Sequence, residues 1–224
     1  MTMGSAASAS EYPARNAVGG IAQADDVDSV RARHYDLLAV LLGRAPDQDL
    51  LDLLALSPAG VGVLGRHVAN LGVAAAEAPE ATVEREFFAL FVGVGRGEFL
   101  PYASYYLTGF LNERPLARVR KDLVALGLAR DDDATEPEDH LPFLLEVMGG
   151  LASGRFEAPA GMQAQFFIRH IAPWAGRFFA DLEQARSARF YRAVGGLGRA
   201  FIDVEAEAFA MDHGRTRAGA SVAL

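Results

Sequence analysis

The sequence of 224 residues contains no cysteine. This absence excludes disulfides, zinc sites built from thiolates, iron–sulfur ligation by cysteine and a thiol nucleophile. Long apolar runs are also missing: the longest apolar-rich stretch, residues 99–111, is shorter than the ~18 to 20 residues of a membrane span. The N-terminus lacks the basic and apolar regions of a secretory signal. We therefore expect a soluble, cytoplasmic protein that does not insert into a membrane.

Positive charge is scarce as well. There are 21 basic against 29 acidic residues, a formal net charge of −8. Such a surface repels nucleic acid and anionic membrane unless a local basic patch dominates, and the sequence indicates none. None of the five histidines has the spacing of a metal-ligand pair. We predict no metal, no cofactor and no nucleic-acid partner.

What the chain does have is apolar residues, 51% of the total, at helical spacing. No alternation typical of β-strands appears. The predicted fold class is all-α: a single compact multi-helix bundle of about nine or ten helices. We expect a disordered leader over residues 1–25, a helical domain over 26–212, a frayed tail over 213–224 and a hinge near 127–135.

The predicted helix boundaries follow from caps and breakers. Order is expected to begin at Asp28–Ser29, an N-cap, and Pro46–Asp47 opens the second helix. Further helices are predicted at 81–92, 102–111, 112–126 (ended by Gly127), 136–151, 160–186 (interrupted at Pro173) and 187–211. Thr135 and Glu138 have capping-box spacing, with Pro137 in the first turn. Pro142 would lie deeper in that helix, where we expect a kink or a 3₁₀ start.

The stretch Thr135-Glu136-Pro137-Glu138-Asp139-His140-Leu141 follows the acidic run Asp131-Asp132-Asp133. Its carboxylates complement a helix macrodipole, which explains the acidity but not the histidine. Asp139 and His140 are also an acid–base pair in type. However, the sequence offers no nucleophile elbow and no metal to complete a catalytic site.

Aromatic residues gather upstream. Tyr102, Tyr105 and Tyr106 share one helical face beside Ser104. Core packing is the default for this spacing, but tyrosine hydroxyls need polar partners and often border a groove. A groove lined by tyrosine and rimmed by carboxylates would suit a peptide with apolar residues and arginines.

Two other patterns have plain explanations. Gly93-x-Gly95-x-Gly97 follows no strand and lacks Gly-Lys-Ser/Thr, so it is typical of a loop that ends a helix. His34 and His67 are expected to be half-buried or at the surface. His170 lies among aromatics on an apolar helix, and we expect a packed histidine bonded to a carbonyl.

Three blocks together resemble one family. Glu136-Pro137-Glu138-Asp139-His140 resembles the E-P-x-D-H signature of the TorD/DmsD-like redox-enzyme maturation chaperones. The segment Glu86-Phe87-x-x-Leu90-Phe91-Val92-Gly93, with Leu100-Pro101-Tyr102-x-Ser104-x-Tyr106, is similar to a second block, and His170-Ile171-x-Pro173-Trp174 to a third. The resemblance covers about residues 29–211, in the same order. Many members have tryptophan where this chain has Tyr102.

The resemblance implies an all-helical cytoplasmic chaperone, without catalytic activity, for a molybdopterin oxidoreductase such as a formate dehydrogenase or a dimethyl sulfoxide or trimethylamine N-oxide reductase. Members bind the client's twin-arginine signal peptide or its body until cofactor insertion, and some form dimers by domain swapping. Peptide-binding residues predicted on this basis are Asp139, His140, Glu136, Tyr102, Ser104, Tyr105 and Phe91, with Pro137 shaping the hinge. Two alternatives stay open: a small hydrolase that uses Asp139 and His140, and a non-catalytic helical adaptor.

Overall fold

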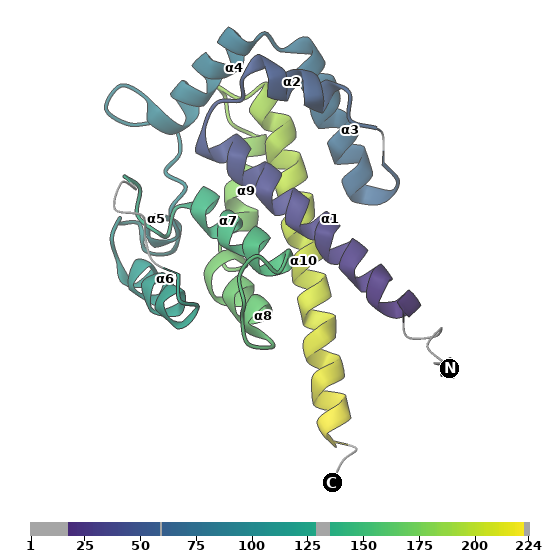
Figure 1. Ribbon diagram of the computed structural model, residues 1–224. Helices are drawn as coiled ribbons and strands as arrows, with labels where there is room; N and C mark the ends of the chain where they lie inside the picture. The colour runs from purple at the N-terminus through teal and green to yellow at the C-terminus, as the bar shows by residue number, and fades with distance from the viewer. Residues whose placement is uncertain (1–17, 59, 129–134, 222–224) are drawn as a thin grey trace, which may run out of the picture.

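The structure is a computed structural model that describes residues 18–58, 60–128 and 135–221, with side chains over 27–58, 60–128 and 135–211. Within these ranges the only β-type pairing is one isolated bridge, so the all-α prediction is confirmed (Figure 1). The helices are α1 (Val18–Gly43), α2 (Gln48–Ala55), α3 (Gly62–Glu77), α4 (Glu80–Phe87), α5 (Ala103–Thr108), α6 (Arg114–Ala125), α7 (Leu141–Ala152), α8 (Met162–Phe166), α9 (Ala175–Glu183) and α10 (Phe190–Ser221). Two π-helical segments continue α4 and α8: η1 (Phe88–Val92) and η2 (Phe167–Ile171).

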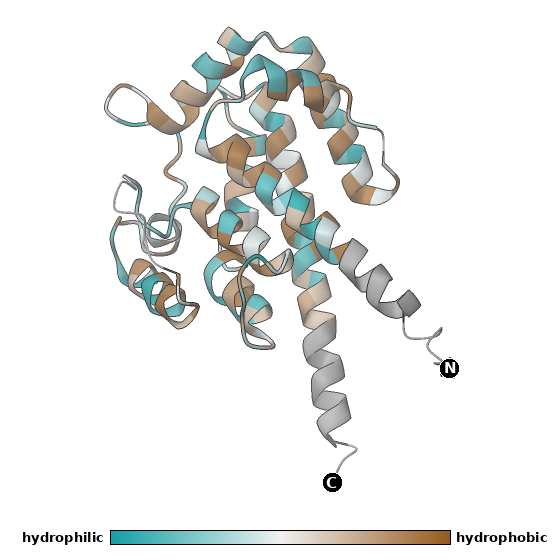
Figure 2. Ribbon diagram, in the orientation of Figure 1, coloured by the Kyte–Doolittle hydropathy of each residue, from teal (hydrophilic) through white to brown (hydrophobic). Residues whose placement is uncertain are grey.

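The long helix α10 is the central helix of the bundle. It packs on α9 and α3, while α1 crosses it and packs chiefly on α7. In Figure 1, α2, α3 and α4 cluster at one end and α5 and α6 lie to one side. Hydrophobic and hydrophilic residues alternate along α1, α3 and α4 (Figure 2), as expected for helices with one buried face. No helix in the described residues is long and apolar enough to cross a membrane.

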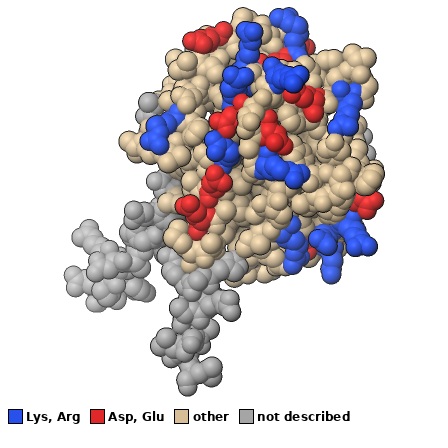
Figure 3. Space-filling view, turned by 180° about the vertical axis from the view of Figure 1, so that it is seen from behind, with Lys and Arg blue, Asp and Glu red and all other residues tan. Residues whose placement is uncertain are grey.

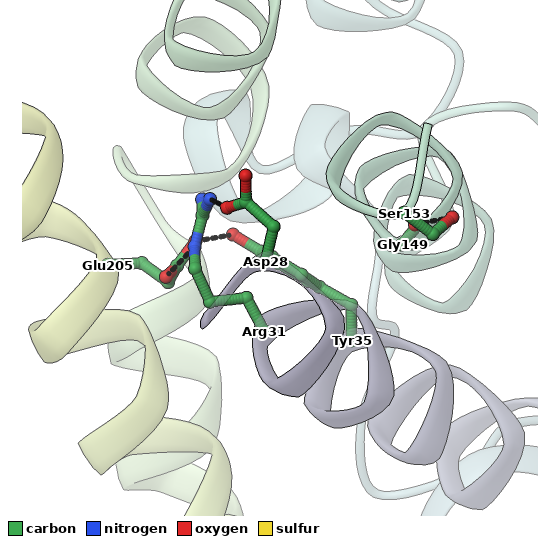
Figure 4. A network of polar contacts seen from close by, with 6 residues as sticks. All are labelled: Asp28, Arg31, Tyr35, Gly149, Ser153 and Glu205. Atoms are coloured by element: carbon green, nitrogen blue, oxygen red, sulfur yellow. Dashed lines mark hydrogen bonds and ion pairs between the residues drawn. The ribbon is translucent and has the colours of Figure 1, made fainter. Parts of the chain in front are cut away.

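Buried polar side chains fasten distant helices together. Arg31 on α1 donates from Nε and Nη2 to both carboxylate oxygens of Glu205 on α10, at 2.8 and 2.7 Å (Figure 4). The Tyr35 hydroxyl donates to the same carboxylate at 2.6 Å, and burial, reinforced by Glu205, raises the pKa of Tyr35. Glu205 is buried, so removal of either donor would leave its charge poorly compensated.

A second buried carboxylate caps the start of α10. Glu86 on α4 accepts from the backbone N–H groups of Arg189, Phe190 and Tyr191, at 2.7 to 3.2 Å. These N–H groups have no partner within the helix. Gly93, at the end of η1, has φ +64°, and a Cβ there would lie 2.0 Å from the Arg96 carbonyl oxygen. Glu86 and Gly93, which both belong to the second sequence block, are therefore needed for the fold.

Several predicted boundaries were close. Asp47 caps α2 by accepting from the Leu50 N–H at 3.0 Å, Gly127 follows α6 with φ +67°, and a turn at Pro173 separates η2 from α9. Others were wrong: α1 begins at Val18, before Asp28, and α10 continues past Met211 to Ser221. Residues 1–17, 129–134 and 222–224 lie outside the described residues, so the predicted leader over 1–17, the hinge over 129–134 and the last three residues of the tail stay predictions.

The predicted helix start at residue 136 was also wrong. The helix begins at Leu141, with His140 at the N-cap position and no side-chain cap. The capping box does not form because Glu138 turns toward another helix, as described below. Pro142 therefore lies in the first turn, where a missing N–H removes no hydrogen bond, and the expected kink has no cause.

Candidate functional site

Backbone hydrogen bonds join the acidic stretch to the tyrosine-rich one. The Leu141 N–H donates to the Pro101 carbonyl at 2.8 Å, and the Ala103 N–H donates to the Asp139 carbonyl at 2.9 Å. Between them, Tyr102 and His140 form the isolated antiparallel bridge. The two motifs that the sequence suggested thus meet at the entries of α5 and α7, through residues that are 34 or more positions apart in the chain.

Asp139 is fully buried beneath this junction. Its Oδ2 accepts from the Ser104 N–H at 2.8 Å, in the first turn of α5. Its Oδ1 and the Ser104 hydroxyl, also buried, make no hydrogen bond to any residue that the structure describes. Asp139 therefore fixes the position of the acidic stretch against α5, while direct contact between Asp139 or Ser104 and a peptide stays a prediction.

His140 and Tyr102 form the exposed side of the junction. Their half-buried rings stack, with centroids 4.8 Å apart and an angle of 26° between their planes. Burial lowers the pKa of His140 to about 4, although the carboxylates of Glu136 and Asp139 oppose this shift. Burial, with the hydrogen bond to Glu136, raises the pKa of Tyr102. At neutral pH both rings are therefore uncharged.

The exposed carboxylate of Glu136 stands beside this ring pair. Its Oε2 accepts a short hydrogen bond from the Tyr102 hydroxyl. Pro137 is half-buried, and its carbonyl accepts from the His140 N–H at 3.0 Å, which closes a turn. An uncharged ring stack next to one anionic group is an arrangement that accepts a guanidinium, by stacking and by ion pairing.

Glu138 has a role that the sequence did not reveal. It is buried, and Arg120 on α6 donates to both of its oxygens from Nε, at 3.1 and 3.0 Å, with Nη2 2.9 Å from Oε2. The bidentate pair fastens the 135–140 segment to α6. No local spacing signal links residues 120 and 138, so only the tertiary structure could disclose this pair.

The other two tyrosines of the 102–106 segment, Tyr105 and Tyr106, each contact an arginine. The Arg96 guanidinium lies over the Tyr105 ring at 5.2 Å, and its Nη2 donates to the Tyr105 hydroxyl at 2.6 Å. Arg177 lies over Tyr106 at 5.0 Å. Phe91, also predicted at the site, instead makes its ring contacts with Phe87 and Tyr191. The structure thus brings together Tyr102, Ser104, Glu136, Asp139 and His140, with Tyr105 one helical turn further on.

The third block is a structural cluster. His170 is buried, as expected, but its Nε2 lies 2.7 Å from Asp122 Oδ2 on α6, so the predicted carbonyl partner was wrong. Arg169 also donates to Asp122, at 2.7 and 2.9 Å. Burial lowers the pKa of His170, while hydrogen bonds from His170 and Arg169 outweigh burial and hold the pKa of Asp122 below its usual range. Trp174 is buried alongside and donates to the His170 carbonyl at 2.7 Å.

The geometry does not assemble a hydrolytic pair. In such a pair the carboxylate accepts from the histidine ring. Here Asp139 Oδ2 faces the Ser104 N–H and Oδ1 has no partner. His140, with a pKa of about 4, is a weak base at neutral pH. The described residues contain no cluster of His, Asp and Glu suited to a metal ion.

Two cavities lie away from this junction. One, of about 420 Å³, lies between α3, α4 and the start of α10, and the other, of about 450 Å³, lies between α1 and α7. Neither is lined by residues of the 101–106 or 135–141 segments. The Tyr102 and His140 rings and the Glu136 carboxylate together form a surface that we call the platform. The predicted groove stays a prediction.

Comparison with known proteins finds one family model and one solved structure that match most of the helical part of the chain. A family model described as "Nitrate reductase delta subunit" matches residues 60–180. A crystal structure of a protein from Archaeoglobus fulgidus, described as a candidate redox enzyme maturation protein, superposes with a TM-score of 0.52 at 18% identity. It covers 77% of this chain and 93% of that chain. At this identity the likeness shows a shared fold.

Several curated proteins with one name, "Chaperone protein TorD", are similar to this chain. "Chaperone protein TorD" of Aliivibrio fischeri is 29% identical over 139 residues, 58% of this chain and 65% of the relative. The Vibrio cholerae protein of that name is 32% identical over 126 residues, 52% and 57%. That of Ferrimonas balearica is 28% identical over 193 residues, 78% and 88%. The first two matches span 65% and 57% of their relatives' length. The chain belongs to the nitrate reductase delta subunit family, as a TorD-like member.

Proposed function

We propose that the protein is a cytoplasmic, non-catalytic chaperone that binds a molybdopterin oxidoreductase, by its twin-arginine signal peptide, its apo-enzyme or both, before cofactor insertion. Family membership and the relatives named as chaperones support this proposal. The observation that carries it is the Tyr102–His140 stack beside Glu136, two uncharged rings next to an exposed carboxylate. Dimerisation by domain swapping belongs to the same proposal.

The chemistry of the platform fits an arginine pair. One guanidinium would lie over a ring of the stack, which does not repel it because His140 is neutral above about pH 4. The Glu136 carboxylate would pair with either guanidinium, since its Oε1 accepts no hydrogen bond from the described residues. The apolar region of the peptide would follow toward the Tyr105 and Tyr106 rings.

A peptide titration tests the proposal. The probes are a fluorescent signal peptide with its arginine pair and apolar region, and the same peptide with both arginines changed to lysine. We expect saturable binding of the first and weaker binding of the second, because an ammonium neither stacks nor pairs bidentately. His140→Ala is expected to weaken binding about tenfold and Glu136→Gln about threefold.

Two further variants separate contact from position. Glu84→Gln, at an exposed residue of α4, is the charge control and is expected to leave affinity unchanged. Asp139→Ala removes the bond to Ser104 and is expected to lower both affinity and unfolding free energy, because the carboxylate is buried. Equal affinity of the wild type, His140→Ala and Glu136→Gln for the arginine peptide would refute this site.

A further inference from the structure

A second feature of the molecule is a basic stripe on α6 that net charge conceals. Arg114, Arg118 and Lys121 are exposed and follow each other at spacings of four and three, which places them on one face of the helix. No carboxylate of the described residues pairs with them, although the chain carries a net charge of −8. The expectation of no local basic patch is thus corrected by the structure.

The opposite face of α6 explains why these charges point outward. Pro115, Leu116, Val119, Asp122 and Leu123 are buried. The acidic group of this set, Asp122, is already taken by Arg169 and His170. In Figure 3, which views the molecule from behind, blue and red side chains are interspersed over most of this face, and a few blue ones lie at the lower right.

Apolar side chains continue the stripe at the start of the helix. Phe110 is 70% exposed, and Leu107 and Leu111 are each 43% exposed. The turn that presents them is well fixed. Thr108 Oγ1 donates to the Ser104 carbonyl at 2.8 Å, and Gly109 (φ +85°) and Asn112 (φ +60°) adopt the left-handed conformation that glycine and asparagine tolerate.

We propose that the Phe110–Leu111 turn and the Arg114–Arg118–Lys121 stripe form a second protein-binding surface, whose occupant is an acidic helix on a partner protein. Exposed aromatic residues beside arginines are the composition of protein interfaces. From Arg114 to Lys121 the stripe spans about 10 Å at ~1.5 Å per residue. Carboxylates at positions i, i+4 and i+7 of a partner helix span the same distance. Phe110 would enter an apolar contact at the end of that helix.

This surface adjoins the platform and is distinct from it. Arg120, on the same helix, binds Glu138 of the 135–140 segment. The platform attracts cations through Glu136, whereas the stripe attracts anions. One partner that carries an arginine pair and an acidic helix would therefore be held at two adjoining places with opposite charge requirements.

The test uses two synthetic helical peptides in fluorescence anisotropy. One has Glu at i, i+4 and i+7 with a neighbouring Phe, and the other has Gln in place of Glu. We expect the acidic peptide to bind, to lose affinity as salt rises, and to lose about tenfold in the variant Arg114→Ala/Arg118→Ala/Lys121→Ala. Phe110→Ser, at an exposed side chain, is expected to weaken binding without loss of stability.

Matched controls decide between explanations. The variant Arg44→Ala/Arg66→Ala/Arg192→Ala removes equal charge from exposed positions elsewhere and is expected to bind the acidic peptide as the wild type does. Equal binding of the Gln peptide, or equal loss in both triple variants, would overturn the proposal. Tighter binding of a single-stranded oligonucleotide than of the acidic peptide would overturn it too. The twin-arginine peptide, titrated in parallel, should be unaffected by the α6 variant, so failure here is separable from failure of the platform.

Discussion

Two histidines of this protein stand beside acidic residues and have opposite surroundings. His170 is 3% exposed, and its ring nitrogen lies 2.7 Å from the carboxylate of Asp122. His140 is half-buried and stacks on Tyr102, and within the described part of the chain no carboxylate bonds to its ring. A histidine whose bonding capacity is used internally holds helices together, whereas one that presents a ring face can receive a ligand. The comparison separates a structural block of the sequence from the block that we propose binds the peptide.

The largest expected effect is on the structural side of this comparison. His170→Ala should lower the unfolding free energy by about 3 kcal/mol, because it opens a cavity and leaves Asp122 buried without its ring partner. Denaturant unfolding measures this. His67→Ala, at a half-buried histidine of α3, is the matched control and should cost less than about 1 kcal/mol. Affinity for the arginine peptide should stay unchanged in folded His170→Ala; a loss there would remove the distinction between the two histidines.

The pH dependence of stability tests the burial of His140. Its pKa is about 4 in the folded protein against 6.5 ordinarily, so between these values the unfolded chain binds more protons. Stability is therefore expected to fall as pH drops through this window, by up to about 3 kcal/mol from this group. His170, whose pKa is also lowered, adds a loss of the same sign.

The variant His140→Phe isolates this contribution, because it keeps a ring on Tyr102 and removes the titrating group. We expect the wild type to lose more stability than His140→Phe when unfolding is measured at pH 7.5 and again near pH 5. Parallel losses in the two proteins would mean that His140 titrates normally and lies in water.

The smallest expected effect concerns the Tyr102 hydroxyl. Tyr102→Phe removes the bond to Glu136 but keeps the ring stack, so unfolding free energy should change by less than about 1 kcal/mol. Affinity for the arginine peptide should stay within about threefold of wild type. Tyr102→Ala is the contrasting variant and should lose as much affinity as His140→Ala, because either change destroys the stack. A loss of affinity in Tyr102→Phe as large as that in Tyr102→Ala would mean that the hydroxyl, and not the ring stack, is needed for peptide binding.

Much of the fold was predictable because helix signals are local. Asp47 before α2, Gly127 after α6 and the turn at Pro173 act over a few residues, and the structure confirms each. The start of α7 was mistaken for the opposite reason. Thr135 and Glu138 have the spacing of a capping box, but Arg120 from another helix binds Glu138. A tertiary ion pair thus replaced a local hydrogen bond.

The sequence by itself determined the helical class of this protein and the absence of thiol chemistry, since these depend on composition and short-range periodicity. Only the tertiary structure decided what each polar residue does. In the folded protein Asp139 is buried and accepts a hydrogen bond from the Ser104 N–H, and the His140 ring stacks on Tyr102. His170 is hydrogen-bonded to Asp122. The tertiary structure also exposed a basic stripe on α6 in an acidic chain. Burial and partner choice depend on contacts between residues far apart along the chain, and those contacts have no local signature.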